Sequence, residues 1–257
     1  MTTLTALTSE KHGDLRVIPS SRLQIAQAQH VINVKANEVA LSASTFPVFI
    51  TRNPSNGRLA LTAVLSFEEG KNLFTRGGGW SAIFEPVVLR TYPLFLMATD
   101  SNEKGYCVGI DEASNAFSRE DGERLFDDSG QPSHYHDRVF RMLEAGIADE
   151  EQTNLFLHKV DELGLIKPVD LLVTYASGEA KTIQGLITVD EDRLKTLSAE
   201  QVAELNSSGY LFTLHALLMS LSQLNRLIRL NNSDEELEEI RQAKLQVARD
   251  QGSATEV

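Results

Sequence analysis

Cysteine is nearly absent from this chain, and its scarcity excludes one class of protein. Cys107 is the single cysteine among 257 residues. No disulfide can therefore form within the chain, which excludes a small disulfide-stabilised scaffold. Because Cys107 lies in the apolar stretch YCVGI, we expect a small buried core residue there, with a reactive nucleophile as the alternative.

A long uncharged hydrophobic run is also lacking. The nearest approach, Tyr210–Leu221, is shorter than a membrane-spanning helix requires and contains His215. The first residues, MTTLTALTSEKHGDLR, do not show a basic segment followed by an apolar one, so they do not resemble a signal peptide. We therefore expect a cytoplasmic protein with no integral membrane segment.

Basic residues are outnumbered by acidic ones. The chain has 24 lysines and arginines against 36 aspartates and glutamates, which gives a formal net charge of -12. Nucleic acids and anionic membranes attract proteins that expose a basic surface, so we expect no nucleic-acid partner. The net charge does not exclude a small basic site.

Motifs for common cofactors and nucleophiles are missing as well. Gly77-Gly78-Gly79 has neither the lysine and hydroxyl residue of a phosphate-binding loop nor the glycine spacing of a dinucleotide site, so it indicates a flexible loop. No Gly-x-Ser-x-Gly motif and no cysteine–histidine signature is present. We expect no cofactor, and whether the protein is an enzyme stays open.

The patterns that are present indicate a globular protein with strands joined by turns. Hydrophobic residues make up 42% of the chain, which is enough for a substantial core. Residues 48–50 and 59–65 are two apolar runs. The residues Asn53-Pro54-Ser55-Asn56-Gly57 between them favour a tight hairpin. The order of four such runs along the chain favours an antiparallel meander. The predicted strands are 48–50, 59–65, 94–98 and 106–110.

Apolar residues at helical spacing predict a short helix at 35–44, a long middle helix at 135–163 and a largely buried C-terminal helix at 210–230. Residues 169–175 and 181–189 predict a further hairpin, and Ser198 with Gln201 forms a capping-box pattern at the start of another helix. We therefore predict an α+β fold, in which an antiparallel sheet built from hairpins packs against the long middle helix and the buried C-terminal helix.

No linker rich in proline, glycine or serine divides the chain, so we expect a single domain over residues 1–231. Residues 232–257 are highly charged, and we expect a solvated helix that frays into a partly disordered tail. Phe212 and Met219 widen the apolar stripe of 210–230. That stripe either completes a monomer core or forms the interface of a homodimer.

The best candidate for a ligand-binding site is the segment 80–99. Its arginine lies among apolar residues, so the guanidinium must reach the surface, cap a turn or find a partner. The planar guanidinium suits a carboxylate or a phosphate. Two acidic residues at the end of the fourth predicted strand are also candidates, because sheet ends often display functional carboxylates. The candidate ligand-binding residues are Trp80, Arg90, Tyr92, Asp111 and Glu112.

A metal site is the alternative to this binding site. His134 and His136 lie at the head of a predicted helix, where a solvated helix start is the simpler interpretation. Two imidazoles two residues apart share a metal only in an extended or cap conformation, because in a helix they point about 200° apart. A third ligand would come from His30 or Glu38. We expect no bound metal and keep these four residues as the alternative.

Several short motifs, spread over nearly all of residues 8–231, together resemble the SapC family of bacterial proteins. The resemblance implies a cytoplasmic accessory protein of a surface-layer, secretion or peptide-modification pathway, and it implies no catalytic residues. The motifs are Lys11-His12, Leu15-Arg16-Val17, His30, Glu38, Phe46-Pro47-Val48, Leu89-Arg90-Thr91-Tyr92-Pro93, Ile110-Asp111-Glu112, Leu125-Phe126-Asp127 and the leucine-rich ending LLMSLSQLNRLIRL.

An apolar core without a recognisable catalytic centre favours a binding or accessory protein that holds a peptide or protein partner. A metal-dependent enzyme acting on a peptide or small molecule is the alternative. A self-assembling surface-layer component is a third hypothesis, which the lack of an export signal disfavours.

Overall fold

The computed structural model describes residues 4–53, 56–99 and 105–248. The chain forms two compact units, and each unit is built from two separate stretches of sequence. Unit 1 comprises residues 1–29 and 74–151, and unit 2 comprises residues 30–73 and 152–257. The α+β class, with antiparallel sheets and a long helix, is confirmed. The expectation of a single domain over residues 1–231 stays a prediction.

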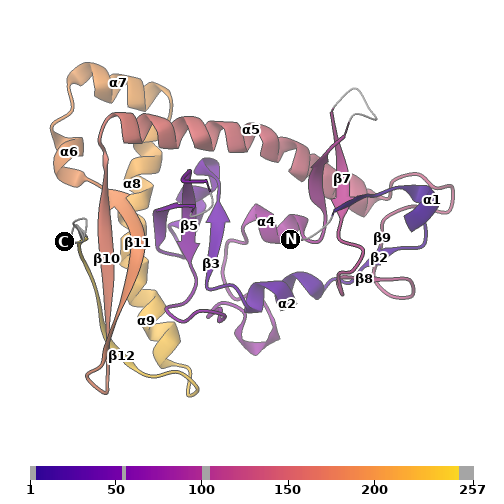
Figure 1. The fold of residues 1–257 in the computed structure, drawn as a ribbon, viewed down its shortest axis with the longest axis horizontal. Helices are drawn as coiled ribbons and strands as arrows, with labels where there is room; N and C mark the ends of the chain where they lie inside the picture. The colour runs from indigo at the N-terminus through magenta and orange to yellow at the C-terminus, as the bar shows by residue number, and fades with distance from the viewer. Residues whose placement is uncertain (1–3, 54–55, 100–104, 249–257) are drawn as a thin grey trace, which may run out of the picture. The chain divides into compact units, whose positions relative to one another are not determined.

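The long helix α5 spans His134–Glu162 and passes without a break from unit 1 into unit 2 (Figure 1). Gly146 lies inside this helix without breaking it, because one glycine costs a helix only about 1 kcal/mol and the apolar stripe continues beyond it. Phe156, Leu157 and Val160 of its second half are buried.

Unit 1 is a set of short elements around a small apolar core. β7 lies between β1 and β6 in one sheet, and β2 lies between β8 and β9 in another. The elements of unit 1 that precede α5 are β1 (Thr5–Ala6), α1 (Ser9–His12), β2 (Arg16–Val17), α2 (Ser21–Gln27), the 3₁₀ turn η2 (Arg76–Gly78), α4 (Val87–Thr91), β6 (Phe95–Ala98), β7 (Tyr106–Ile110), β8 (Phe117–Ser118) and β9 (Glu123–Arg124).

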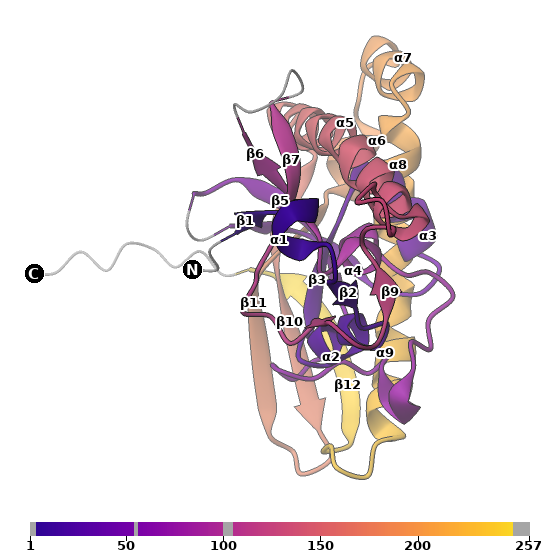
Figure 2. The ribbon, with the colours of Figure 1, turned by 90° about the vertical axis from the view of Figure 1, so that its right-hand side faces the viewer.

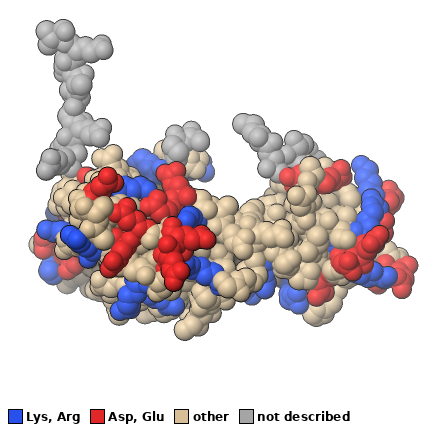
Figure 3. Space-filling view, turned by 90° about the horizontal axis from the view of Figure 1, so that it is seen from below, with Lys and Arg blue, Asp and Glu red and all other residues tan. Residues whose placement is uncertain are grey.

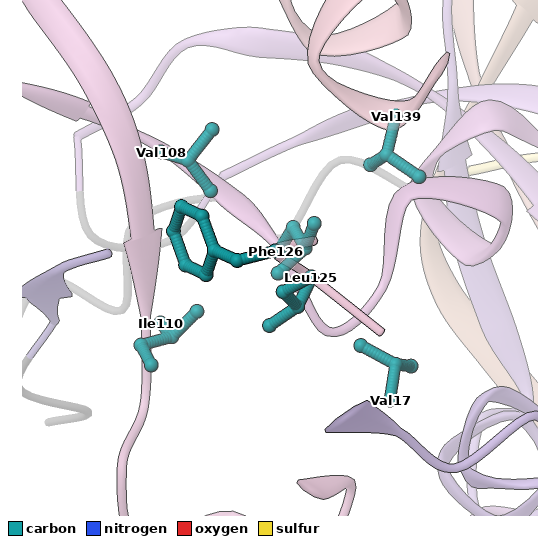
Figure 4. Close-up of a cluster of buried hydrophobic side chains, with 7 residues drawn as sticks. Val17, Val108, Ile110, Leu125, Phe126 and Val139 are labelled. Carbon is teal, nitrogen blue, oxygen red and sulfur yellow. The ribbon is translucent and has the colours of Figure 1, made fainter. Parts of the chain in front are cut away.

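Side chains from five segments meet in the core of unit 1 (Figure 4). Leu94 comes from the residue just before β6. Val17 comes from β2, Val108 and Ile110 from β7, and Val139 from the first turns of α5. Leu125 and Phe126 fill the centre. Each of these side chains is less than a tenth exposed, and burial of a side chain of this size contributes about 1.5–3 kcal/mol. Cys107, predicted to be buried, is only half-buried in β7.

Unit 2 is a six-stranded sheet in the order β12-β10-β11-β4-β5-β3, and each pair of neighbouring strands in it is antiparallel. Helices α8 and α9 lie along it (Figure 2). Besides the end of α5, its elements are β3 (Val31–Val34), η1 (Ala36–Glu38), α3 (Val39–Ser42), β4 (Val48–Arg52), β5 (Leu59–Val64), β10 (Ile166–Tyr175), β11 (Ala180–Val189), α6 (Glu191–Lys195), α7 (Ala199–Ser207), α8 (Tyr210–Ser220), η3 (Leu221–Gln223), α9 (Leu224–Asn232) and β12 (Ile240–Val247).

The predicted hairpins form, but not as one meander. β4 and β5 pair in unit 2, whereas β6 and β7 pair in unit 1, so the prediction of a single meander is wrong. The long segment between the two hairpins crosses from one unit to the other, and turn chemistry alone does not reveal that crossing. Pro54 and Ser55 of the first turn, like residues 100–104 of the second, lie outside the described residues.

Two predictions for the C-terminal part are corrected. The helix expected after residue 232 is instead the strand β12, which pairs with β10 along its length; residues 249–257 lie outside the described residues. The high charge of residues 232–257 suggested a solvated helix, but pairing with β10 across the sheet prevails. Phe212 and Met219 of α8, predicted to be buried, are 69% and 72% exposed, because α8 buries only one side.

Candidate functional site

The candidate site in unit 1 begins with the short helix α4. Pro86 immediately precedes the helix, and this is a favourable place for proline because its missing N–H would have no helical partner. Leu89 and Thr91 are buried, which turns Arg90 between them to the outside. The helix therefore anchors itself by its apolar side and presents the arginine.

Arg90 lines a cavity of about 350 Å³ together with two further arginines. Arg22 comes from α2 and Arg138 from the second turn of α5. Glu85 and Glu123 are the acidic residues of the lining, and three arginines against two glutamates leave one formal positive charge. We name this cavity, whose lining also includes Tyr92 and Tyr135, the arginine pocket.

Only one of the three arginines has a carboxylate partner among the described residues. Arg22 Nε lies 3.5 Å from Glu85 Oε1. Arg138 instead places its guanidinium 5.3 Å from the centre of the Tyr135 ring, a cation–π contact that leaves its N–H groups available. Arg90 makes no ion pair within the described residues. Two guanidinium groups can therefore receive an anion.

Tyr135 supplies a hydroxyl group to the same pocket. Burial raises the pKa of its phenol, while the nearby positive charges of Arg138 and Arg22 oppose that shift. The hydroxyl therefore stays protonated at neutral pH and can donate a hydrogen bond to an anion. Val17, Val139 and Met142 complete the wall, so the pocket rests directly on the apolar core of unit 1.

A second cavity of unit 1, of about 460 Å³, is connected to the arginine pocket by one hydrogen bond. The Tyr92 hydroxyl, which lines the arginine pocket, lies 3.2 Å from Ser114 Oγ, and Ser114 lines the second cavity. Lys11, His12 and Glu112 are also part of that lining.

His12 and Glu112 form a pair within this second cavity. The imidazole is buried, and its Nε2 lies 2.9 Å from Glu112 Oε1. Its Nδ1 accepts a hydrogen bond from the Thr8 amide at 3.1 Å, so the ring proton is assigned to Nε2, which donates to the carboxylate. Both ring nitrogens are thus engaged, and the pair holds Glu112 in place.

The remaining predicted ligand-binding residues stabilise loops. Trp80 Nε1 donates to the Phe84 carbonyl at 2.9 Å, and its ring lies 6.3 Å from that of Phe74. Asp111 Oδ1 accepts from the Ala113 amide at 3.0 Å and so closes the turn after β7. Neither residue lines the two cavities described here.

The residues of the alternative metal site do not form a cluster. Within the described residues, no group of three or more His, Cys, Asp or Glu side chains could hold a metal ion. His134 and His136 both lie inside α5, a helix on which their side chains diverge. Glu38 of unit 2 is buried and accepts from the Lys35 amide at 2.9 Å, while His30 lines a different cavity of that unit.

Sequence reasoning did not identify the basic and aromatic residues Arg22, Tyr135 and Arg138 of the arginine pocket. Tyr135 and Arg138 are three residues apart in a predicted helix, so the pattern placed them on one face and could have indicated the cation–π pair. Arg22 lies in a stretch without clear periodicity, and no signal in the sequence pointed to it.

The fold and the site define an α+β protein with an arginine-lined pocket. The family model for SapC matches residues 7–227, and the chain belongs to the SapC family. No curated protein and no solved structure matches the chain. No helix within the described ranges has both the length and the apolar character that crossing a membrane would require.

Proposed function

We propose that this chain is a cytoplasmic accessory protein of a surface-layer, secretion or peptide-modification pathway, and that it holds a peptide or protein partner. The arginine pocket receives a carboxylate or phosphate group of that partner. The observation that carries the proposal is the convergence of Arg22, Arg90 and Arg138 on one cavity, where only Arg22 has a carboxylate partner in the part of the chain that the structure describes.

The chemistry of the pocket favours an anion over other ligands. Guanidinium groups bind carboxylates and phosphates through paired N–H donors, and such charge-assisted hydrogen bonds are stronger than neutral ones. Val17, Val139 and Met142 add apolar surface to the lining, and charges attract each other more strongly beside apolar surface than in bulk water. The chain as a whole has a net charge of -12, so an anion should prefer this pocket, with its surplus of positive charge, to other parts of the surface.

The proposal is tested by replacing Arg90 and Arg138 with alanine, singly and together. We expect each single change to weaken partner binding at least about tenfold, because a hydrogen bond to a charged group contributes about 1.5–3 kcal/mol. Two measurements test this effect. One is capture of the partner from native lysate, and the other is titration with inorganic phosphate and acetate, monitored by NMR of the arginine side chains.

Arg58→Ala is the matched control, because Arg58 is an exposed arginine of unit 2 that does not line the arginine pocket. It should leave both measurements unchanged. If the Arg90→Ala/Arg138→Ala double variant folds, as judged by circular dichroism, and still captures the partner as the unchanged protein does, the proposed role of the pocket is wrong.

A further inference from the structure

A groove of about 680 Å³ lies in unit 2, in the sheet itself. Its origin is a bulge in β11. Val169 pairs with Leu186 and Leu171 with Ile183, so Gln184 and Gly185 together face the single residue between Val169 and Leu171. Gly185 has φ = +80°, which glycine adopts without strain. A bulge of this kind bends a strand and increases its twist.

The bulge separates β11 from β4. Beyond the bulge, Leu186 and Ile187 pair with Thr51 and Ile50 of β4. Before it, residues 180–183 pair with β10 on one side, and no strand pairs with the other side of residues 180–185 in the described part of the chain. Half of an internal strand therefore has an open edge.

This open edge forms one wall of the groove. Consecutive residues of β11 from Lys181 to Leu186 all line it. Since side chains alternate between the two faces of a strand, an uninterrupted series shows that the backbone edge faces the groove. The N–H and C=O groups of that edge are the groups with which a further strand would pair.

The floor of the groove is one face of β3, β5 and β4. Their registers place Asn33 opposite Thr62 and Thr51 opposite Ala60, so these four side chains share that face. Thr51 Oγ1 lies 2.8 Å from Thr62 Oγ1, which in turn lies 3.3 Å from Asn33 Oδ1. A row of hydrogen-bonded polar side chains therefore crosses the floor, and Val31, Ala60 and Val64 add apolar surface to the lining.

The opposite face of these strands is covered. Ile50, Leu61 and Ala63 are almost completely buried there, and the Val48 amide donates to Ser220 Oγ of α8 at 2.9 Å. The groove is therefore the accessible side of a sheet whose other side is fixed by helix packing.

One end of the groove continues into an acidic cavity of about 470 Å³. Glu69 and Lys181 line both cavities, and the second has five glutamates against two lysines. Acidic side chains also gather on part of the surface in Figure 3. The glutamates are Glu68, Glu69, Glu179, Glu236 and Glu238.

We propose that this groove binds an extended peptide segment, which adds a strand to the open edge of β11 over residues 181–185 and directs a lysine or arginine side chain toward Glu69 and the acidic cavity. Strand addition suits an unpaired strand edge that lines a groove, and backbone pairing supplies the binding while pockets select side chains. The glutamate surplus selects a basic residue at that end. This site lies in unit 2 and does not depend on the arginine pocket of unit 1.

The probe is a fluorescent six-residue peptide in which threonine and valine alternate after one lysine. Two analogues accompany it: one carries N-methyl groups on alternate backbone amides, and the other has glutamine in place of the lysine. We expect binding of the first peptide, at least tenfold weaker binding of the glutamine analogue and none of the methylated one. Hydrogen exchange of amides 181–185 should slow when the first peptide binds.

Variants of the full chain sharpen the test. Ala60→Phe fills the floor and should abolish binding, whereas Gln242→Phe, on the exposed surface of β12, should not change it. Glu69→Gln should lower the affinity for the lysine peptide to that for the glutamine analogue. The double variant Arg90→Ala/Arg138→Ala should bind the peptide normally, which separates this site from the arginine pocket.

Several results would overturn the proposal. These are equal binding of the methylated peptide, undiminished binding to a folded Ala60→Phe variant, and no protection of amides 181–185 when the peptide is bound. Absence of binding by the lysine peptide at millimolar concentration would overturn it as well.

Discussion

The pKa of one side chain, His136, depends on the groups that are packed around it. Its ring lies 5.8 Å from that of Phe126 and is stacked on Phe140 at 6.2 Å. Within the described residues, its Nδ1 has no hydrogen-bond partner. Burial lowers the pKa of this imidazole, and Asp137, with Oδ1 3.7 Å from Nδ1, only partly opposes the shift. His136 is therefore a partly buried aromatic side chain, and its burial favours the neutral imidazole.

The lowered pKa predicts a stability difference that depends on pH. The unfolded chain takes up a proton on His136 near pH 6.5, whereas the folded protein does so only at lower pH. Stability is thus lost as the pH falls from 6.5 through the folded pKa, because the unfolded state then binds more protons. His136→Phe keeps the ring stack and removes this loss. Denaturation of both proteins at pH 7.5 and 5.5 should show the variant gaining relative stability at the lower pH. An unchanged difference would contradict the prediction.

At the scale of elements, local signals predicted some structures correctly. The hairpin of β10 and β11 and the long helix α5 are where periodicity placed them. The capping box also forms, since Ser198 Oγ accepts from the Gln201 amide and the Gln201 side chain accepts from the Ser198 amide. These features depend on residues close together in the sequence, which is why they were predictable.

Strand β12 was not predictable, because its contacts are distant in sequence or depend on a turn. Asn232, the last residue of α9, accepts from the Ile240 amide at 2.8 Å and donates to the Ile240 carbonyl at 2.9 Å. Asn231 donates to the Glu238 carbonyl at 2.8 Å. Both amides thereby turn the chain from the helix into a strand, and a polar dipeptide at a helix end gives no warning of this.

Asn232→Ala should therefore loosen β12. The change removes both hydrogen bonds to Ile240, and we expect the local free energy of opening to fall by about 1–3 kcal/mol. Hydrogen exchange of the β12 amides measures the effect. Asn225→Ala, an exposed asparagine of α9, is the control and should leave β12 unchanged. If both variants exchange alike, Asn232 does not hold the strand.

At the scale of the whole molecule, the composition limited the classes of partner but did not show where the candidate sites lie. The net charge of -12 does not exclude a local basic site, and Arg90 and Tyr92, which the sequence predicts to bind a ligand, line the same cavity. Arg22 joins them only through the fold, since it lies on α2 far along the chain. The groove beside β11 depends on a bulge, and a single Gly185 in a strand pattern does not specify where pairing will stop.

The division into two units makes a prediction about how the molecule opens. Gly122 lies between β8 and β9 with φ = +118°, and a Cβ there would collide with the Val17 carbonyl. Gly122→Ala should therefore destabilise unit 1 by about 2–4 kcal/mol. We expect hydrogen exchange to accelerate in β7 and the start of α5, while β10 and β11 of unit 2 keep their rates.

Gly178→Ala is the reciprocal control in unit 2. Gly178 has φ = +94° in the turn between β10 and β11, but nothing lies within 4 Å of the added Cβ. Its cost is therefore the backbone strain alone, about 1–2 kcal/mol, and its effect should stay in unit 2. If either variant instead accelerates exchange equally in both units, the chain opens as one cooperative domain, as its sequence predicts. Separate responses would show that each unit holds its own site on an independently stable framework.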